Sequence, residues 1–247
     1  MTVVPAMSDL LTSAPAAPTR REPKRGPRLG HRGQQTRAAL LVAAREAFTS
    51  GGYHGTTVAK IADRAGVSLG TFYTYFADRS AILAQLVRDS VRGLLADPDR
   101  TWRVSQGREG IHRVLLSYLK AHAEDAPFWA VWEEVTLTDP VLAELRRELS
   151  RLLIASVTRE LTRGIDAGLV RPDIDPESCA RALTGMVDRY CHVTFSFDPP
   201  QHQPSPQASA EVLTDIWARA VLLDPDLAGS ADRGAAVPRP RETGSPR

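Results

Sequence analysis

The stretch "GVSLGTFYTYF", residues 66–76, crowds aromatic side chains into one short segment of the chain. Four rings fall within five positions, at Phe72, Tyr73, Tyr75 and Phe76. A helix that only packs into a core should carry charged residues on its outer face. Here the positions predicted to lie outside the core are Thr71, Tyr73 and Thr74, which bear hydroxyls and a ring but no charge. Such a surface suits phosphates and base edges, which accept hydrogen bonds and tolerate apolar contact at thymine methyls.

The residues before this stretch predict two further helices. From Gln35 to Ser50 apolar residues recur at helical spacing, and Gly51-Gly52 supplies a left-handed residue that ends a helix. Thr56 or Thr57 can cap a second short helix, which stops at Gly66, and Ser68 caps the third. Two short helices joined by a glycine turn are typical of a helix-turn-helix. An ordinary helical hairpin is the alternative interpretation.

Composition places the charge at one end of the chain. The 247 residues are 43% hydrophobic, with a formal net charge of only +2, which suits a soluble protein of one large or two small domains. Between Arg20 and Arg37, however, seven basic residues stand against Glu22 alone, a net charge of +6. Residues 1–30 are rich in Ala, Pro and Arg and are predicted to form a disordered basic arm. Residues 224–247 are predicted to be a second disordered tail.

The segment from Thr36 to Leu86 resembles the DNA-binding domain of the tetracycline-repressor (TetR) family of transcriptional regulators. The resemblance rests on "AAREAF" at residues 43–48, "GGY" at 51–53, "TTV" at 56–58 and "AGVSLGTFY" at 65–73. It implies an all-α fold, with an N-terminal three-helix helix-turn-helix domain over residues 31–78. A C-terminal helical ligand-binding and dimerisation domain would then cover residues 79–223.

The resemblance also implies which residues meet DNA. Ser68 to Tyr75 match the recognition helix, with Thr71 near the groove floor and Phe72 and Phe76 in the core. Arg79 stands where the family usually has a phosphate-binding Lys, and Arg suits phosphate through its fork of donors. Leu69 departs from the polar or basic residue of many relatives, which limits base reading there to apolar contact. The predicted DNA-binding residues are Thr57, Ser68, Leu69, Thr71, Tyr73, Thr74, Tyr75 and Arg79.

Further helices are expected after Asp78, which can cap a fourth helix that continues to about Leu95 before Asp97-Pro98-Asp99 breaks it. The expected ranges are Gly107 to Ala123, Pro127 to Leu137, Pro140 to Gly168, Pro176 to Phe197 and Ala208 to Leu223. Residues 126–135, "APFWAVWEEV", group large rings on one helix beside a carboxylate, which suggests a ligand cavity with a polar handle. Ordinary core packing is the alternative. The predicted effector-binding residues are Phe128, Trp129, Trp132, Glu133, Asp188, Tyr190 and His192.

The last two expected helices carry apolar stripes, at Ala182, Met186 and Val193 and at Val212, Ile216 and Ala220. The resemblance makes these stripes a four-helix homodimer interface, and intramolecular core is the alternative.

No motif for catalysis or for metal or cofactor binding is present. His112, His122 and His192 lack partners at metal-ligand spacing, and no Gly-Lys phosphate loop occurs. Cys179 and Cys191 are expected to be reduced thiols in a cytoplasmic protein, and no apolar run approaches a membrane span. The TetR resemblance implies a ligand-responsive regulator, most simply a repressor of a palindromic double-stranded DNA operator, and the predicted ring-lined cavity suggests relief by an apolar or amphipathic small molecule. A nonspecific DNA-binding protein and a helical enzyme are the rival classes.

Overall fold

The computed structural model describes residues 30–96 and 102–224, and every regular element of three or more residues within these ranges is a helix. A single β-bridge, between Val170 and Leu222, joins two loops of the described chain. The predicted arm lies outside the described residues except for Gly30, and the predicted tail lies outside them except for Asp224. The Asp97-Pro98-Asp99 break lies outside them as well.

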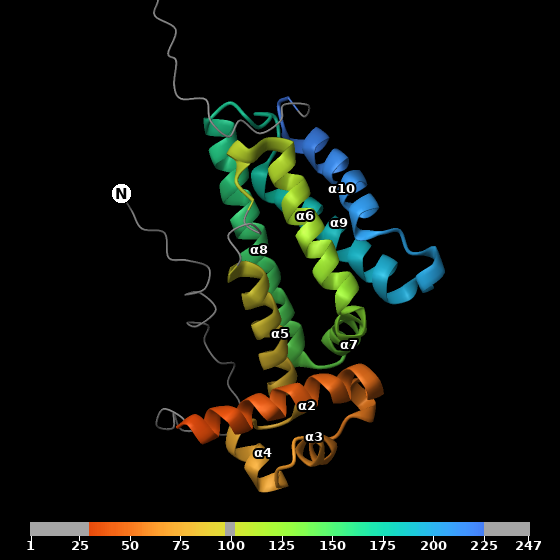
Figure 1. The fold of residues 1–247 in the computed structure, drawn as a ribbon. Helices are drawn as coiled ribbons and strands as arrows, with labels where there is room; N and C mark the ends of the chain where they lie inside the picture. The colour runs from red at the N-terminus through yellow and green to blue at the C-terminus, as the bar shows by residue number, and fades with distance from the viewer. Residues whose placement is uncertain (1–29, 97–101, 225–247) are drawn as a thin grey trace, which may run out of the picture.

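Three helices form a head at one end of the molecule (Figure 1). They are α2 (His31–Gly55), α3 (Val58–Arg64) and α4 (Leu69–Tyr75). Within α2 the backbone breaks at Gly52, whose φ of 65° is left-handed, and one more helical turn follows. The glycine stop was therefore predicted correctly, but the helix resumes beyond it because Thr56 bonds back to the carbonyls of Ala47 and Gly52.

Capping side chains fix where the short helices begin. Thr57 Oγ1 accepts a hydrogen bond from Lys60 N at 3.2 Å, and Ser68 Oγ accepts one from Thr71 N at 3.1 Å. Between these helices Gly66 makes the turn with a φ of 67°. These caps confirm the helix-turn-helix predicted from the sequence, since each cap satisfies an amide that the first helical turn leaves unpaired.

The remaining helices build a body above the head (Figure 1). In that view α5 and α8 rise side by side from the head, α9 packs against α8, and α10 packs against α6. Asp78 caps α5, as predicted, and Asp139, Asp175 and Ser205 cap helices that each open with proline. The body elements are α5 (Arg79–Ala96), η2 (Val104–Gln106), α6 (Gly107–Glu124), α7 (Ala126–Thr136), α8 (Pro140–Asp166), α9 (Pro176–Cys191), η3 (His192–Phe197), η4 (Pro200–His202) and α10 (Pro206–Val221).

The helix expected over residues 176–197 does not stay α-helical to its end. α9 stops at Cys191, and His192–Phe197 continue as a π-helical turn, in which Asp198 N bonds Val193 O at 3.1 Å. Thr194 and Phe195 are buried on this turn. A pattern of apolar spacing does not distinguish the wider turn from an α-helix over so few residues.

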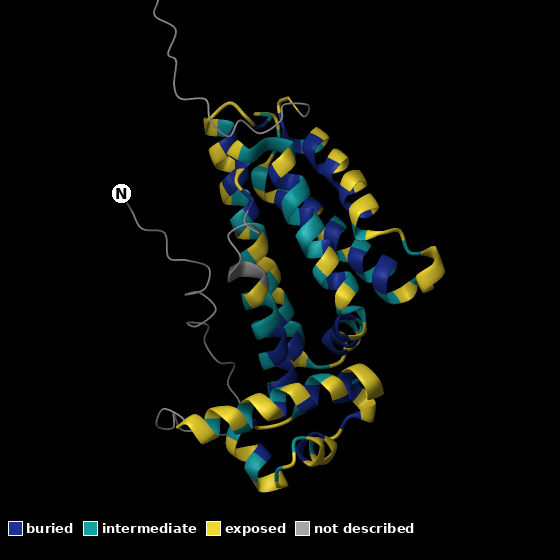
Figure 2. Cartoon of the chain, in the orientation of Figure 1, coloured by how far each residue is buried: buried dark blue, intermediate teal, exposed yellow. Residues whose placement is uncertain are grey.

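Two hydrophobic cores hold the described chain together, and every α-helix of it carries buried residues (Figure 2). The second core lies wholly within the body. The first core is continuous from the head into the body, although a domain boundary was expected at residues 78 and 79. It joins Leu40, Phe48, Ile61 and Phe72 of the head to Ile82, Leu83, Phe128 and Leu142 of α5, α7 and α8.

Candidate nucleic-acid interface and effector site

The outer face of α4 is the candidate nucleic-acid interface. Tyr73 and Leu69 are 54% and 47% exposed, and Thr74 is exposed beside them. Phe72 and Phe76 are buried at 0% and 6% exposure. The crowded rings therefore divide as predicted, with the two phenylalanines in the core and Tyr73 outside it.

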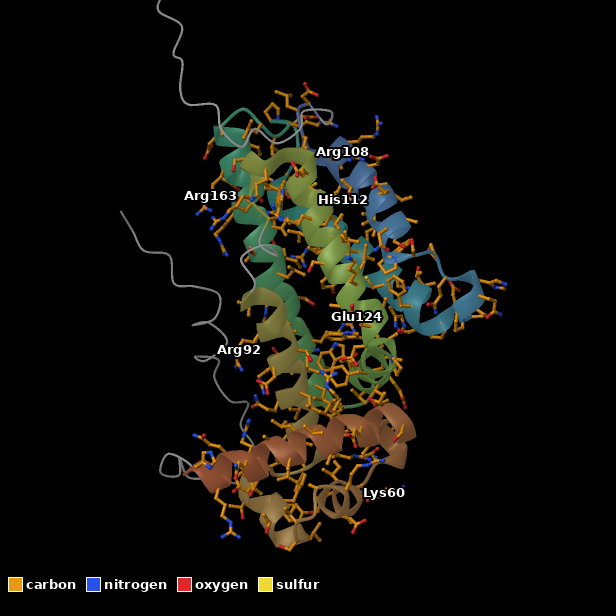
Figure 3. The ribbon with its side chains drawn as sticks, in the orientation of Figure 1. Lys60, Arg92, Arg108, His112, Glu124 and Arg163 are labelled. Atoms are coloured by element: carbon orange, nitrogen blue, oxygen red, sulfur yellow. The ribbon has the colours of Figure 1, made fainter. Side chains whose placement is uncertain are left out.

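The other hydroxyls predicted to meet DNA lie close to this face. Ser68 and Thr57 are exposed, and their oxygens cap α4 and α3. Thr71 is half-buried, with its Oγ1 2.9 Å from Ser68 Oγ. Lys60, exposed in the first turn of α3, adds a positive charge at this end of the molecule, far from Arg108 and His112 on α6 (Figure 3). Both short helices thus present capped N-terminal turns beside hydroxyl groups.

Two predicted DNA-binding residues also make structural contacts. The ring of Tyr75 is half-buried and packs against the first core. Arg79 Nη1 donates to the carbonyls of Tyr53 at 3.1 Å and Thr56 at 3.2 Å, and its guanidinium lies 4.2 Å from the Tyr53 ring centroid. Arg79 therefore holds the loop that leads into α3. A phosphate role for either residue stays a prediction.

The predicted effector rings of α7 are buried between the head and the body, and Glu133 of the same helix is half-buried. Phe128 is fully buried, and Trp129 and Trp132 are 9% and 6% exposed. Arg45 of α2 lies 4.2 Å over the Phe128 ring and pairs with Asp125, just before α7. At least one of the predicted effector rings thus contacts the head directly.

A charged cluster adjoins these rings. Arg146 of α8 pairs with Glu133 of α7 and with Asp188 of α9, the latter through Nη2 at 2.8 Å. Burial opposes the charge on Arg146, but the hydrogen bonds that it donates to Glu133 and Asp188, together with the negative charges of these carboxylates, outweigh burial and raise its pKa. The structure brings Glu133 and Asp188 together, as expected for one site. Arg146, the residue between them, was not predicted, because one arginine on a charge-rich helix has no sequence signal that singles it out.

Two aromatic residues of α6 complete this region. The His122 ring stacks on Trp129 with centroids 4.6 Å apart, and Tyr118 lies 4.2 Å from His122 on the same helix. Burial lowers the pKa of His122 to about 4, against partial opposition from its bond to the Tyr118 carbonyl, so the ring is neutral at pH 7. Trp129 Nε1 is buried with no hydrogen-bond partner in the described chain.

Tyr190 and His192 make different contacts from the rest of the predicted set. Tyr190 donates its hydroxyl hydrogen bond to Ser209 Oγ of α10 at 2.9 Å. His192 lies on η3, which packs against α7, and its ring meets Phe197 edge to face with centroids 4.9 Å apart. His192 Nδ1 is buried without a partner among the described residues.

Comparison with known families agrees with this geometry. The profile described as "Bacterial regulatory proteins, tetR family" matches residues 40–86, which contain the helix-turn-helix. A second profile, "BetI-type transcriptional repressor, C-terminal", matches residues 107–188. The chain belongs to the TetR family of transcriptional regulators. The TetR-family resemblance of residues 36–86 is thereby confirmed, as is the all-α fold with an N-terminal helix-turn-helix.

Curated TetR-family relatives match across most of their own length. The uncharacterised HTH-type transcriptional regulator YhgD of Bacillus subtilis (strain 168) is 24% identical over 181 residues, which are 72% of this chain and 92% of that protein. The fatty acid metabolism regulator protein of the same strain is 26% identical over 153 residues, covering 60% of this chain and 78% of that protein.

Solved structures share the fold. SmeT, the repressor of the Stenotrophomonas maltophilia multidrug efflux pump SmeDEF, superposes with a TM-score of 0.63 at 23% identity, covering 82% of this chain and 98% of SmeT. A SmeT–triclosan complex superposes with a TM-score of 0.62 at 24% identity, covering 83% of this chain and 99% of that chain.

Membrane spans and metal-binding clusters are both absent from the described residues. No helix among residues 30–96 and 102–224 combines the length and apolarity that crossing a membrane requires. In the same ranges no three His, Cys, Asp or Glu side chains gather where they could hold a metal ion.

Proposed function

We propose that this TetR-family regulator is a cytoplasmic, homodimeric repressor that binds a palindromic operator through α4. A small apolar or amphipathic effector would release it from DNA. The observation that carries the proposal is the exposed, uncharged face of α4, where Tyr73 and Leu69 stand out from a helix whose phenylalanine is buried. Exposed rings and hydroxyls on a recognition helix suit a major groove, which offers phosphates, base edges and thymine methyls.

On this proposal the hydroxyls of Tyr73, Thr74 and Tyr75 contact phosphates or bases, and Thr71 and Ser68 approach the groove from the first turn. Leu69 offers apolar contact to a thymine methyl. Thr57 lies at the N-terminus of α3, where amide groups favour an anion. Since Arg79 Nη1 already bonds two carbonyls, a phosphate contact would use Nη2 or Nε.

The proposed effector site surrounds α7. Trp129 Nε1 lacks a partner in the described chain, so an effector with an acceptor atom would satisfy it. Trp132 and Phe128 supply apolar surface, Glu133 and Asp188 supply charge through Arg146, and Tyr190 and His192 border the site from α9 and η3. The complex of SmeT with triclosan, on a related fold, supports a small-molecule effector.

Release of DNA would follow from the contact between α7 and the head. Because Arg45 of α2 lies over Phe128, a shift of α7 that accommodates an effector also shifts α2. The connecting helix α5 offers a second route. Moving a two-state equilibrium almost completely needs about 5.5 kcal/mol of differential binding. An effector that buries roughly 200 Å² more apolar surface in one state supplies most of this, at about 25 cal/mol per Å².

The proposed dimer interface lies on α9 and α10. On α10 Val212 and Ile216 are 56% and 45% exposed, while Leu213 and Trp217 of the same helix are buried. Ala182 of α9 is exposed, which permits close approach of a second helix. Exposure of Val212 and Ile216 argues against intramolecular core at these two positions. Met186, Val193 and Ala220 are half-buried.

Selection of bound fragments from random double-stranded DNA tests the proposal. Two inverted half-sites, protected together by the purified protein, are the expected result, followed by release in a screen of apolar compounds. Protection spread over unrelated sequences would instead support a nonspecific DNA-binding protein and contradict the proposal.

A further inference from the structure

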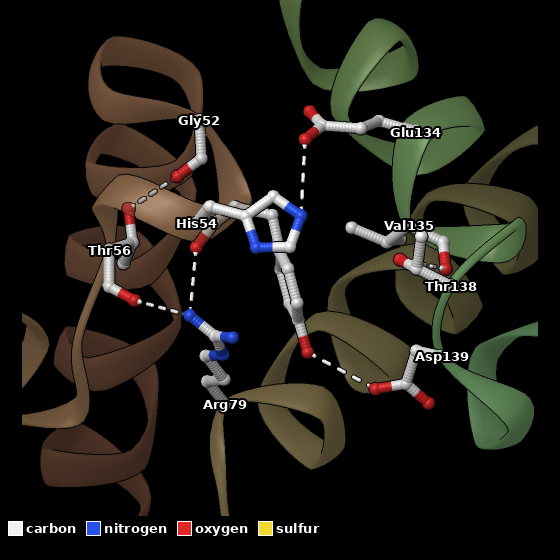
Figure 4. Close-up of polar contacts among 9 residues, drawn as sticks. Gly52, His54, Thr56, Arg79, Glu134, Val135, Thr138 and Asp139 are labelled. Atoms are coloured by element: carbon white, nitrogen blue, oxygen red, sulfur yellow. Dashed lines mark hydrogen bonds and ion pairs between the residues drawn. The ribbon is translucent and has the colours of Figure 1, made fainter.

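One carboxylate, that of Asp139, ties three helix ends together where the head meets the body. Its Oδ1 accepts hydrogen bonds from Val141 N at 2.9 Å and Leu142 N at 3.2 Å, and so caps α8. Its Oδ2 accepts from Ser80 Oγ of α5 and from the Tyr53 hydroxyl of α2 at 3.2 Å. Figure 4 shows Asp139 reached by a dashed line from the tyrosine of the head.

The Tyr53 side chain that reaches Asp139 is itself fixed on both sides. Its ring is 4% exposed, stacks on Phe48 with centroids 5.8 Å apart, and lies under the Arg79 guanidinium. Arg79 also bonds the Thr56 carbonyl, one residue before the cap of α3 (Figure 4). The carboxylate is thus connected through two side chains to the start of the helix-turn-helix.

The hydrogen bonds of Asp139 together outweigh the effect of its burial. Burial raises the pKa of this carboxyl, but the bonds from Ser80, Leu142, Val141 and Tyr53 together lower it below its usual value. Ser80 and Tyr53 have one hydroxyl proton each, so Ser80 donates to Asp139 and Tyr53 donates to Asp139 or to Ser80, 2.6 Å away. Such charge-assisted bonds are stronger than neutral ones.

Other polar contacts between head and body do not replace this one. His54 and Glu134 are 3.4 Å apart, but their side chains are 61% and 50% exposed, and exposed pairs contribute little. Arg45 bonds Ser90 Oγ of α5 at 2.7 Å and pairs with Asp125 before α7. Arg79 joins the head to α5 alone. None of these polar contacts reaches α8, so with Asp139 disconnected only the shared hydrophobic core would hold the head against that helix. Apolar packing is non-directional, so it fixes the angle of the head less strictly than hydrogen bonds do.

We infer that the hydrogen-bonded group of Tyr53, Ser80 and Asp139 sets the orientation of each head, and hence the half-site spacing that the dimer accepts. Tyr53, Ser80 and Asp139 are positioning residues, since none lies on the exposed face of α4. The inference rests on the proposed function, in which two heads bind one palindrome. Two base pairs added between half-sites turn one by about a fifth of a helical turn relative to the other. A dimer whose two heads are held rigidly should bind an operator with this altered spacing much more weakly.

The test compares affinities for the selected operator and for versions with two base pairs inserted or removed between its half-sites. Tyr53→Phe keeps the ring and loses only the hydroxyl. Asp139→Ser keeps a side chain that caps α8 but is too short to reach Ser80 and Tyr53. Asp175→Ser is the matched control, because Asp175 caps α9 through Ser178 N at 2.8 Å, on a helix of the body.

We expect wild type and Asp175→Ser to share one sharp spacing preference. In Tyr53→Phe and Asp139→Ser the ratio of affinities between native and altered spacing should fall about tenfold, the factor expected for one hydrogen bond to a charged group. If the ratio of affinities between native and altered spacing is unchanged in both variants, the inference is overturned. The same holds if the affinities at every spacing fall equally while the melting temperature falls, because the variants would then only be less stable. Wild type without any spacing preference would contradict the proposed function instead.

Discussion

His122 should make the protein less stable in mild acid, by an amount that its surroundings set. The ring is 8% exposed and stacks between Tyr118 and Trp129 at centroid distances of 4.2 and 4.6 Å. Burial of this ring lowers its pKa from the ordinary 6.5 to about 4. A proton that binds His122 must therefore place a charge in a poorly solvated position.

The sign of the effect follows from which state binds the proton first. At pH 7 His122 is neutral in both the folded and the unfolded protein. As the pH falls through about 6.5 the unfolded chain takes up the proton while the folded chain does not, which favours unfolding. The loss grows until the pH reaches about 4, where the folded ring also protonates. At about 1.4 kcal/mol per pH unit, the expected total is about 3 kcal/mol of unfolding free energy.

Urea unfolding of wild type and His122→Phe, at several pH values from 7 to 4, measures this contribution. Phe keeps a ring against Trp129 and has nothing to titrate. Protonation of carboxylates with lowered pKa values, such as Asp139, also lowers the unfolding free energy in acid. This loss is the same in wild type and in His122→Phe, so it cancels in the comparison. The difference between the two pH profiles should therefore approach about 3 kcal/mol. Parallel profiles would show that His122 is not held neutral by its surroundings and would refute the reasoning.

Three further predictions concern binding and assembly. Trp132→Ala should bind the operator like wild type but lose its response to an effector that quenches tryptophan fluorescence; a wild-type response would move the effector site elsewhere. Deleting residues 1–30 should make the slope of log affinity against log salt concentration shallower, by roughly 0.9 for each phosphate that the arm neutralises. An unchanged slope would show that the arm does not contact DNA. The double variant Val212→Glu with Ile216→Glu should sediment as a monomer. The control Leu137→Glu should remain a dimer, because this side chain is 88% exposed and lies on no predicted interface. If the double variant remains a dimer, the interface lies elsewhere.

Local features of the head could be predicted from the sequence because each is encoded within a few residues. Ser68 and Thr57 cap the helices they precede, and Gly52 and Gly66 take the left-handed conformation that breaks or turns the chain. The separation of Phe72 from Tyr73 needed only helical periodicity. These are interactions between neighbours, so the order of residues along the chain carries the information.

The joints between head and body could not be predicted, since their partners lie far apart in sequence. Arg45 and Asp125 are 80 positions apart, and Tyr53 and Asp139 are 86 apart. Arg146 meets Asp188 across 42 positions. Each of these side chains also has a plausible solvent-exposed role on its own helix, and only the packing of helices selects its partner. For the same reason the structural contacts of Arg79, which compete with a purely phosphate-binding role, were not expected from the sequence.

The central claim is that the outer face of α4 reads DNA, and operator affinity of Tyr73→Phe measured beside its melting temperature tests that claim most directly. Tyr73 is 54% exposed, so removing its hydroxyl should leave the melting temperature nearly unchanged. Loss of one hydrogen bond to a phosphate, about 1.5–3 kcal/mol, predicts operator binding weaker by roughly ten- to a hundred-fold. Unchanged operator affinity, or a large fall in melting temperature with DNA binding intact, would contradict the claim.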